Sequence, residues 1–141
     1  MLITCSRYHD FCAGHRVAGH EGKCQHLHGH NYRVHFVIQG DKLDEVGRVI
    51  DFSVIKNTLC QWLEDEWDHK FLLWEDDDFR HGLLSYDSSI VLVPFNPTAE
   101  NMAYYLLNTI GPLLLKTVEL IEVTVEETRK CSAKVRKNNG I

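Results

Sequence analysis

Residues 29–39 read Gly-His-Asn-Tyr-Arg-Val-His-Phe-Val-Ile-Gln, and this stretch decides the class of fold. Its bulky apolar residues fall on every second position: Tyr32, Val34, Phe36 and Ile38. Successive side chains of a strand point to opposite faces of a sheet, so this period of two predicts a half-buried β-strand. The other residues are expected on or near the opposite face: His30, Arg33, His35, Val37 and Gln39.

Two amphipathic helices are predicted on the C-terminal side of this strand. The first covers residues 53–67, where apolar residues recur at helical spacing and form one stripe. The second begins at Thr98, whose hydroxyl can cap a helix, and Glu100 suits the first turn because its charge complements the helix dipole. This helix is expected to end near Ile110, at Gly111-Pro112 or slightly later.

Shorter segments complete the pattern. Extended structure is predicted for residues 1–15, 49–52, 90–95 and 117–128, and loops for residues 16–27 and 75–89. The resulting order, β-β-α-(β)-α-β, predicts an α+β fold with an antiparallel sheet. A chain of 141 residues has room for one such domain, residues 1–141.

Composition narrows the class of protein. The net charge is −5 and no block of Lys or Arg stands out, which argues against a nucleic-acid partner. No apolar run approaches the ~20 residues of a membrane helix, and the first residues lack a signal-peptide pattern. The five cysteines are dispersed and odd in number, which is typical of free thiols in a reducing compartment. We therefore expect a cytoplasmic protein.

His28 and His30 are the strongest candidates for metal ligands. They stand two residues apart, so an extended strand presents both rings on one face. His15 lies upstream and can complete a tripod that leaves one coordination position open, as in catalytic zinc sites. His20 and His26 remain weaker alternatives, because His20 lies in a loop and three ligands stacked on one strand reach poorly around one ion.

Cys24 lies close in sequence to these histidines. It follows Lys23 in a predicted loop, and a neighbouring cation can lower the pKa of a thiol and so favour the reactive thiolate. Two other interpretations stay open at this point. In the first of these, Cys24 is an inert thiol. In the second, Cys24 is a fourth zinc ligand, which would make the site structural.

Three acidic or basic side chains further along the chain are also candidates. Asp68 and His69 end the first helix, where an acid can orient a neighbouring imidazole, although spacing alone equally fits a polar helix end. Glu127 shares the strand parity of Ile121, Val123 and Val125. An inward carboxylate needs a partner, which a ligand at the strand end would supply. The alternative is that the strand has already left the core there.

Taken together, these residues resemble the 6-pyruvoyltetrahydropterin synthase / 6-carboxytetrahydropterin synthase family over nearly the whole chain. The motifs that carry the resemblance are Phe11-Cys-Ala-Gly-His15-Arg16, Cys24-x3-His28-Gly-His30-Asn-Tyr, Val49-Ile-Asp51-Phe52, Asp68-His69-Lys-Phe-Leu, Asn96-Pro-Thr98-Ala-Glu100-Asn and Glu127-Thr128. Their order and spacing fit the family. Phe11-Cys-Ala-Gly-His departs from the commoner Phe-x-Ala-Ala-His.

The resemblance implies a role for each candidate. Zn²⁺ is expected on His15, His28 and His30, with Cys24 as the base. Asp68 and His69 are expected to handle protons. Glu127 is expected among the catalytic residues as the anchor of the pterin ring, with Thr98 and Thr128 as further substrate contacts.

The resemblance also implies the fold and the reaction. The fold is the tunnelling fold, a four-stranded antiparallel sheet with two helices on one face, whose subunits close a barrel as a homohexamer of two trimers. The short Cys24-x3-His28 spacing resembles the bacterial 6-carboxy-5,6,7,8-tetrahydropterin synthase of queuosine and 7-deazaguanine biosynthesis. That lyase converts 7,8-dihydroneopterin triphosphate to 6-carboxytetrahydropterin, acetaldehyde and triphosphate.

Two alternatives to this function remain. One is the pyruvoyl synthase, which eliminates triphosphate without cleaving a carbon–carbon bond. The other is a non-catalytic, zinc-stabilised binding or assembly protein, which would use Cys24 to close a four-ligand site. A third branch of the family generally carries Glu in place of Cys24, and the cysteine argues against it.

Overall fold

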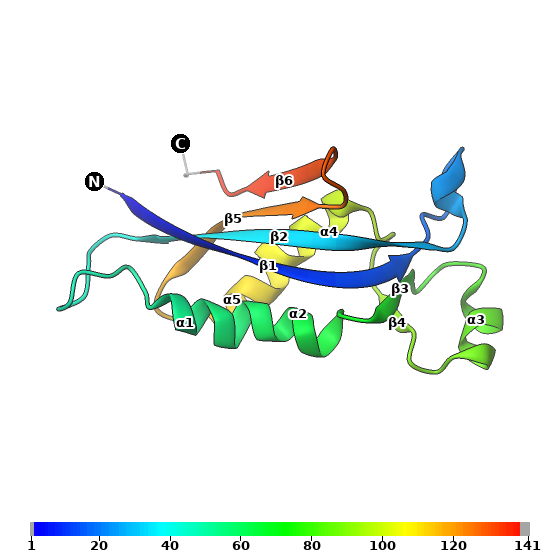
Figure 1. Ribbon diagram of the computed structural model, residues 1–141, viewed down its shortest axis with the longest axis horizontal. Helices are drawn as coiled ribbons and strands as arrows, with labels where there is room; N and C mark the ends of the chain where they lie inside the picture. Colours follow the sequence, from blue (N-terminus) through cyan, green and yellow to red (C-terminus); the bar gives the residue numbers. More distant parts are fainter. Residues whose placement is uncertain (1, 139–141) are drawn as a thin grey trace.

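A computed structural model describes residues 2–138 and shows a curved sheet with the long helices along one face (Figure 1). The strands are β1 (Ile3–His15), β2 (His28–Gly40), β3 (Lys70–Trp74), β4 (Val91–Val93), β5 (Glu119–Glu126) and β6 (Ser132–Arg136). The helices are α1 (Phe52–Ile55), α2 (Gln61–Glu66), α3 (Arg80–Tyr86), α4 (Ala99–Tyr105) and α5 (Gly111–Leu114). Three shorter elements are η1 (Lys23–Gln25), a 3₁₀ turn, and the π-helical turns η2 (Lys56–Cys60) and η3 (Leu106–Ile110).

The sheet is larger than the four strands that the sequence predicted. Its order is β4-β3-β1-β2-β5-β6. The neighbours β1, β2, β5 and β6 pair antiparallel, but β6 was not predicted, and the strand predicted at residues 90–95 (β4) lies at a parallel edge, so the sheet is mixed. Two short strands extend the sheet beyond β1, because β3 pairs parallel to β1 and β4 pairs parallel to β3. The prediction of a four-stranded sheet was therefore wrong in strand number. Buried Leu72 and Leu73 anchor this added edge.

The two long strands β1 and β2 set the positions of the candidate metal ligands. Their register runs from Ile3 opposite Gly40 to His15 opposite His28, so the loop of residues 16–27 leaves the sheet at this end. His30 has the same strand parity as buried Tyr32. The expectation that His30 lies on or near the opposite face was wrong, because alternation puts both residues on the helix-covered face.

Strand β5 contains an irregularity that its sequence does not reveal. The pairing with β2 shifts between Val37 and Ile38, so Leu120 enters the core and Ile121 is only half-buried. The assignment of Ile121 to the inward set was therefore wrong, because a bulge changes which side chains face the core. Val123 and Val125 are buried as predicted.

The two predicted helices are present and each is interrupted by a π-helical turn. The first runs through α1, η2 and α2, and the Asp51 carboxylate caps it by accepting from the Ser53 amide at 2.9 Å. Residues 49–52 are consequently no strand, since Phe52 already belongs to the helix. The second runs through α4, η3 and α5 to Leu114, with Thr98 as its cap. The predicted loop 75–89 contains one further short helix, α3.

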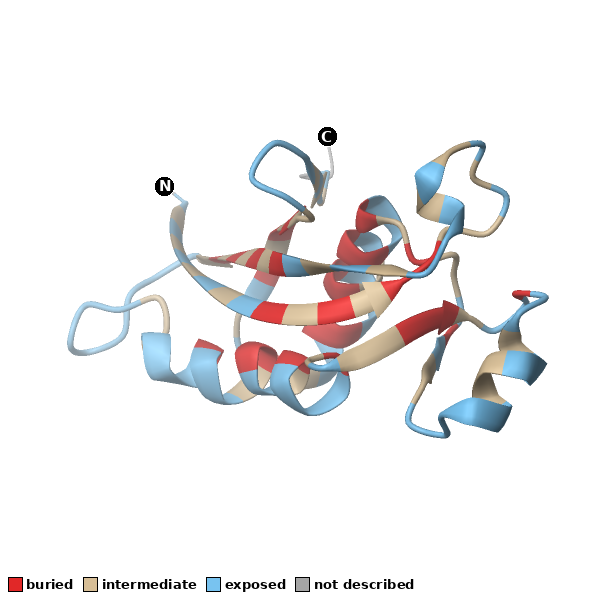
Figure 2. Ribbon diagram, turned by 45° about the vertical axis from the view of Figure 1, so that its right-hand side comes forward, coloured by how far each residue is buried: buried red, intermediate tan, exposed pale blue. Residues whose placement is uncertain are grey.

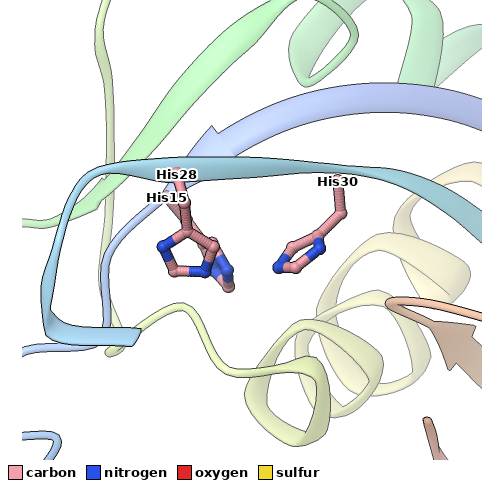
Figure 3. Close-up of side chains that lie close together, drawn as sticks. All are labelled: His15, His28 and His30. Carbon is pink, nitrogen blue, oxygen red and sulfur yellow. The ribbon is translucent and has the colours of Figure 1, made fainter. Parts of the chain in front are cut away.

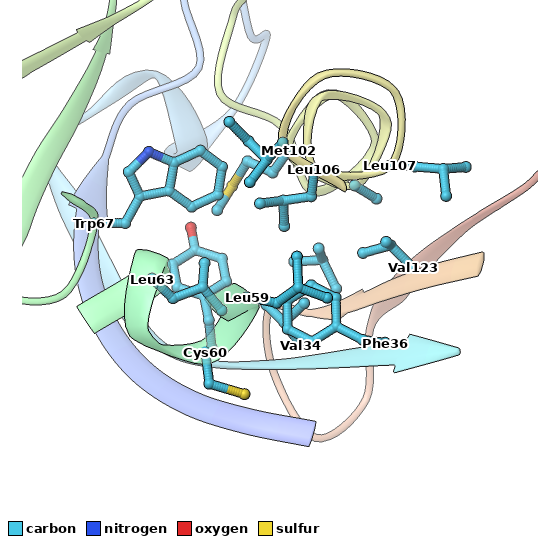
Figure 4. Packing of buried hydrophobic residues seen from close by; sticks show 14 of the residues in the cluster. Val34, Phe36, Leu59, Cys60, Leu63, Trp67, Met102, Leu106, Leu107 and Val123 are labelled. Atoms are coloured by element: carbon cyan, nitrogen blue, oxygen red, sulfur yellow. The ribbon is translucent and has the colours of Figure 1, made fainter. Parts of the chain in front are cut away.

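The core lies between the sheet and these two helices (Figure 2). Trp67, Met102 and Leu106 from the helical side pack over Val34 and Phe36 of β2 in Figure 4. The buried apolar stripe of each helix explains why both lie on the same face of the sheet. Within residues 2–138, no helix has the length and apolar character needed to cross a membrane.

Candidate metal centre and active site

Three imidazole rings meet at the end of the β1–β2 pair. His15 ends β1, and His28 and His30 begin β2, so the register brings all three to one place. Their ring centroids lie 4.6 to 5.1 Å apart. Figure 3 shows the rings gathered on the same side of β2. We refer to His15, His28 and His30 as the histidine group.

The ring nitrogens of the histidine group fit a metal ion. One nitrogen from each ring lies within 4.8 Å of the others. The three Nε2 atoms are buried and have no hydrogen-bond partner. A buried polar atom without a partner is costly, so three at one point indicate a group that binds them. These residues could therefore hold a metal ion.

Backbone carbonyl groups orient two of these rings. Nδ1 of His15 donates to the carbonyl oxygen of Pro97 at 2.7 Å, and Nδ1 of His28 donates to that of His26 at 2.7 Å. A carbonyl can only accept, so both protons lie on Nδ1. The Nε2 lone pairs of the neutral rings are then free for a metal, which is the usual outer-shell arrangement of metal-binding histidines.

Burial also favours the neutral, metal-binding form of two of these rings, His15 and His30. Burial lowers the pKa of His15 to about 4, opposed by the hydrogen bond to Pro97 and aided by His28 and His30. Burial likewise lowers the pKa of His30, and the nearby Glu127 carboxylate opposes this shift. His15 is therefore neutral near pH 7, and a neutral imidazole is the ligand that transition metals require.

Glu127 lies directly beside the histidine group. Its Oε1 is 3.4 Å from Nε2 of His15 and 3.6 Å from Nε2 of His30. The residue follows β5 on the parity of buried Val125, and about a quarter of its side chain is exposed. β5 ends at Glu126, and the half-buried Glu127 side chain directly after it lies beside the rings of His15 and His30. The Glu127 carboxylate therefore borders the position that a metal ion bound by the three rings would occupy.

Cys24 lies in the short turn η1 between β1 and β2, outside the histidine group. Burial raises the pKa of the Tyr32 hydroxyl, and Glu127 and Cys24 add to this effect. Within the described residues, Cys24 joins no group of ligand atoms with the three histidines. A four-ligand group that includes Cys24 is therefore not assembled within residues 2–138.

Asp68 and His69 form a second cluster, and the thiol beside them is Cys12. Asp68 Oδ2 accepts from Nδ1 of His69 at 2.8 Å, and Asp68 Oδ1 accepts from the Cys12 amide at 3.1 Å. Cys12 Sγ lies 3.7 Å from Nδ1 and 3.6 Å from Nε2 of His69, so the sulfur sits over the ring. We refer to Cys12, Asp68 and His69 as the thiol cluster.

The backbone holds His69 in an unusual conformation. Its φ is 59°, in the left-handed region that residues with a side chain rarely adopt. Its amide donates to the carbonyl of Cys12 at 2.7 Å, which fixes it against β1. Burial raises the pKa of Asp68, but bonds from the Cys12 amide and His69 outweigh it and the net pKa lies below its ordinary value. Asp68 is therefore an anion that orients His69.

Two adjoining cavities, of about 880 and 500 Å³, open around His69. The larger is lined in part by His30, Asp68, Glu127 and Thr128, so it joins the histidine group to the predicted proton-handling pair. Cys24 lines neither cavity and makes no side-chain hydrogen bond with Asp68 or His69 within the described part of the chain.

The remaining predicted contacts have local structural roles. The Thr98 hydroxyl accepts from the Asn101 amide at 3.1 Å and so caps α4. The Thr128 hydroxyl accepts from the amides of Lys130 and Cys131, each at 3.1 Å, and shapes the turn after β5. Their contacts with a substrate stay predictions.

Sequence reasoning missed two features of this region. Nothing in the motif Phe11-Cys-Ala-Gly-His15 indicated that Cys12 would meet Asp68 and His69, 56 and 57 positions away. The parallel pairing of β3 with β1 creates that contact, and no local pattern predicts it. The buried Tyr32 hydroxyl, which has no partner, was also missed, although its parity with His28 and His30 could have indicated it.

The sequence is similar to those of known proteins over most of its length. A 6-carboxy-5,6,7,8-tetrahydropterin synthase of Rickettsia typhi is 39% identical over 138 residues, covering 95% of this chain and 100% of the relative. The enzyme of that name from Haemophilus influenzae is 32% identical and covers 76% of this chain and 81% of its own.

Solved structures show the same architecture. An uncharacterized protein of Wolinella succinogenes superposes with a TM-score of 0.80 at 26% identity, covering 98% of this chain and 99% of the other. The Caenorhabditis elegans 6-pyruvoyl tetrahydropterin synthase gives 0.72 at 25% identity, covering 98% and 97%. The family profile of 6-pyruvoyl tetrahydropterin synthase matches residues 4–138. With that match and these relatives, the chain belongs to the 6-pyruvoyl tetrahydropterin synthase family of enzymes.

Proposed function

We propose that this chain is a zinc-dependent 6-carboxy-5,6,7,8-tetrahydropterin synthase. It would convert 7,8-dihydroneopterin triphosphate to 6-carboxytetrahydropterin, acetaldehyde and triphosphate in queuosine or 7-deazaguanine biosynthesis. The observation that carries the proposal is the convergence of three unpartnered Nε2 atoms beside Glu127, in a chain whose full-length relative from Rickettsia typhi bears this name.

The histidine group is the proposed zinc site. His15, His28 and His30 hold the ion through Nε2, and three protein ligands leave a position for substrate, as in catalytic zinc sites. A bound Zn²⁺ supplies Lewis acidity that makes protons next to the substrate's side-chain oxygens easier to remove. The chain itself contributes a neutral ring at His15, and the carbonyl groups of Pro97 and His26 orient the rings of His15 and His28.

Proton transfer is assigned to Cys24 and to the Asp68–His69 pair. As a thiolate, Cys24 takes a proton from the substrate side chain, and His69 relays or returns one while Asp68 fixes its ring. General acid–base help of this kind contributes about 10²–10⁴-fold to a rate.

The active site is proposed to lie between two copies of the chain. Within residues 2–138, Cys24 lines neither of the two cavities that His69 lines, and a second copy would bring His69 of one chain to Cys24 of the other. The sheet also ends in open edges at β4 and β6, which a barrel of subunits would close. We propose a homohexamer of two trimers, acting in the cytoplasm without membrane or nucleic-acid partners.

Glu127 is the proposed anchor of the pterin ring. Its carboxylate can accept two N–H bonds from the 2-amino-pyrimidine edge, a charge-assisted pair with defined geometry. Thr128 lines the larger cavity together with Glu127. Thr98 directly follows Pro97, whose carbonyl accepts from His15. For the triphosphate, Arg129 in the larger cavity and Lys70 in the smaller one are the proposed cations.

The test is product analysis with zinc-loaded protein. Incubation with 7,8-dihydroneopterin triphosphate should release acetaldehyde and a carboxypterin, both identified by mass spectrometry. Zinc-loaded protein that binds no pterin and gives no turnover would overturn the proposal in favour of a zinc-stabilised binding protein.

A second candidate is the pyruvoyl synthase reaction. It is favoured by the family profile and by the Caenorhabditis elegans neighbour, both of which carry that name. This activity eliminates triphosphate without carbon–carbon cleavage. Turnover that yields triphosphate but no acetaldehyde would identify it.

A further inference from the structure

A buried ion pair outside the metal centre joins two segments at the same end of the molecule. Arg16, just after β1, donates from Nη1 to Oδ1 of Asp77, which lies between β3 and α3. Arg16 is 7% exposed and Asp77 1% exposed. Figure 1 shows that the loop after β1 and the region of α3 share this end. The pair has no part in the proposed chemistry, so its burial needs another explanation.

The arginine is held in one orientation by further contacts. Its guanidinium carbon lies 3.7 Å from the centroid of the Phe79 ring, and the Phe79 amide donates to Asp77 Oδ1 at 2.8 Å. Its Nε–H donates to the carbonyl of Gln25 at 2.9 Å. A guanidinium is planar and rigid, so fixing one edge on Asp77 directs the other edge at Gln25.

These contacts close the loop that carries Cys24. Gln25 directly follows Cys24, and the Cys24 carbonyl accepts from the amide of Val17 at 2.8 Å. Arg16 and Val17 therefore bind two consecutive carbonyls, those of Gln25 and Cys24. Both links start directly after the metal-ligand candidate His15, so the position of Cys24 is tied to that of the histidine group.

We infer that Arg16 and Asp77 are positioning residues that hold the Cys24 thiol in place beside the metal centre. This inference rests on the proposed function, because it concerns the thiol assigned as the base. Stability alone is a weak reason for such a pair, since apolar residues of similar volume often stabilise a fold as well as a buried ion pair does. An apolar residue cannot donate to the Gln25 carbonyl, and a lysine lacks the rigid planar fork that joins Asp77 and Gln25 in one fixed geometry.

The experiment uses zinc-loaded Arg16→Lys and Asp77→Asn proteins. Arg16→Lys keeps the positive charge but loses the Nε–H bond to Gln25. Asp77→Asn keeps the side-chain volume but loses the charge. The matched controls are Asp76→Asn and Asp78→Asn, which alter exposed neighbours on either side of Asp77.

Two readouts are measured on each folded protein. The first is the rate at which iodoacetamide alkylates Cys24, followed on its peptide by mass spectrometry, and it should rise several-fold in both test variants. The second is kcat, which should fall on the order of 10²-fold with KM little changed, because a small misplacement of a reacting group has that effect. Both controls should behave as the parent protein.

The outcomes separate this inference from the proposed function. Folded, zinc-loaded Arg16→Lys protein with unchanged Cys24 alkylation and kcat would overturn the inference, even if its melting temperature falls. Faster alkylation with unchanged kcat would support the positioning of Cys24 but reject its role as the base. If Asp77→Asn fails to fold, Arg16→Lys alone decides.

Discussion

The histidine group and the thiol cluster lie at the same end of the sheet and are built in opposite ways. In the histidine group, the three Nε2 atoms are buried and have no hydrogen-bond partner. The Nδ1 atoms of His15 and His28 donate to backbone carbonyl groups. In the thiol cluster, Asp68 and His69 bond to each other, and the His69 side chain is 78% exposed. Three donor atoms lie close enough for a metal in both places. Geometry alone therefore does not separate them, but the hydrogen-bond partners do.

This contrast teaches what each cluster is suited for. Buried nitrogens without partners are stabilised when a group binds them, whereas an exposed acid–imidazole pair that is already hydrogen-bonded can exchange protons with a substrate. We therefore expect metal on the first and proton transfer on the second.

The largest expected effect is the loss of metal from His28→Ala. Removing one of three ligands should abolish zinc binding and turnover, because two imidazoles cannot hold the ion tightly. His69→Ala should keep one zinc per chain, measured by inductively coupled plasma mass spectrometry. The control is His26→Ala, an exposed side chain whose backbone carbonyl still orients the ring at position 28. Zinc loss from His69→Ala would break the comparison.

The two thiols should differ next. Cys24→Ala should lower kcat by about 10²–10⁴-fold with zinc retained, because it removes the proposed base. Cys12→Ala should lower kcat far less, since the Cys12 amide still binds Asp68. Steady-state kinetics with zinc analysis decides between them. An inactive Cys12→Ala beside an active Cys24→Ala would reverse the two assignments.

Acid should destabilise the metal-free protein through His15. Its pKa is about 4 when folded against an ordinary value of 6.5, so the unfolded chain binds more protons between these pH values. The free energy of unfolding should then fall, by up to about 3 kcal/mol, as the pH drops from 6.5 to 4. Urea titrations across this range measure it. His15→Gln should flatten the profile, whereas His81→Gln, at an exposed position, should leave it unchanged.

The smallest expected effect comes from Thr98. Thr98→Ala removes the cap of α4 and should reduce the free energy of unfolding by about 1 kcal/mol. Thr98→Ser keeps the hydroxyl and should have the parent protein's free energy of unfolding, as measured by thermal unfolding. A KM that rises in both variants would show that the threonine methyl contacts the substrate in addition.

Much of the fold followed from local pattern. The alternation of Tyr32, Val34, Phe36 and Ile38 predicted β2, and all four are buried. Both long helices were predicted within a few residues, because their apolar stripes have a clear period. The parallel strand β3 was missed, since a five-residue segment carries too little periodicity to stand out.

The candidate site was also predictable where it depends on local pattern. The His-x-His spacing named two of the three members of the histidine group, because parity on a strand is a local property. The expectation for Ile121 failed because a bulge depends on the neighbouring strand.

By itself, then, the sequence determined which side chains share a strand face and where the helices begin, since both depend on neighbours within a few residues. Only the tertiary structure decided that His15 stands opposite His28, that Cys12 rather than Cys24 meets His69 within one chain, and that Asp77 reaches Arg16. These contacts join residues 13 to 61 positions apart. Their cause is the pairing of β1 with both β2 and β3, a choice made by packing of the whole core and absent from any short stretch of the chain.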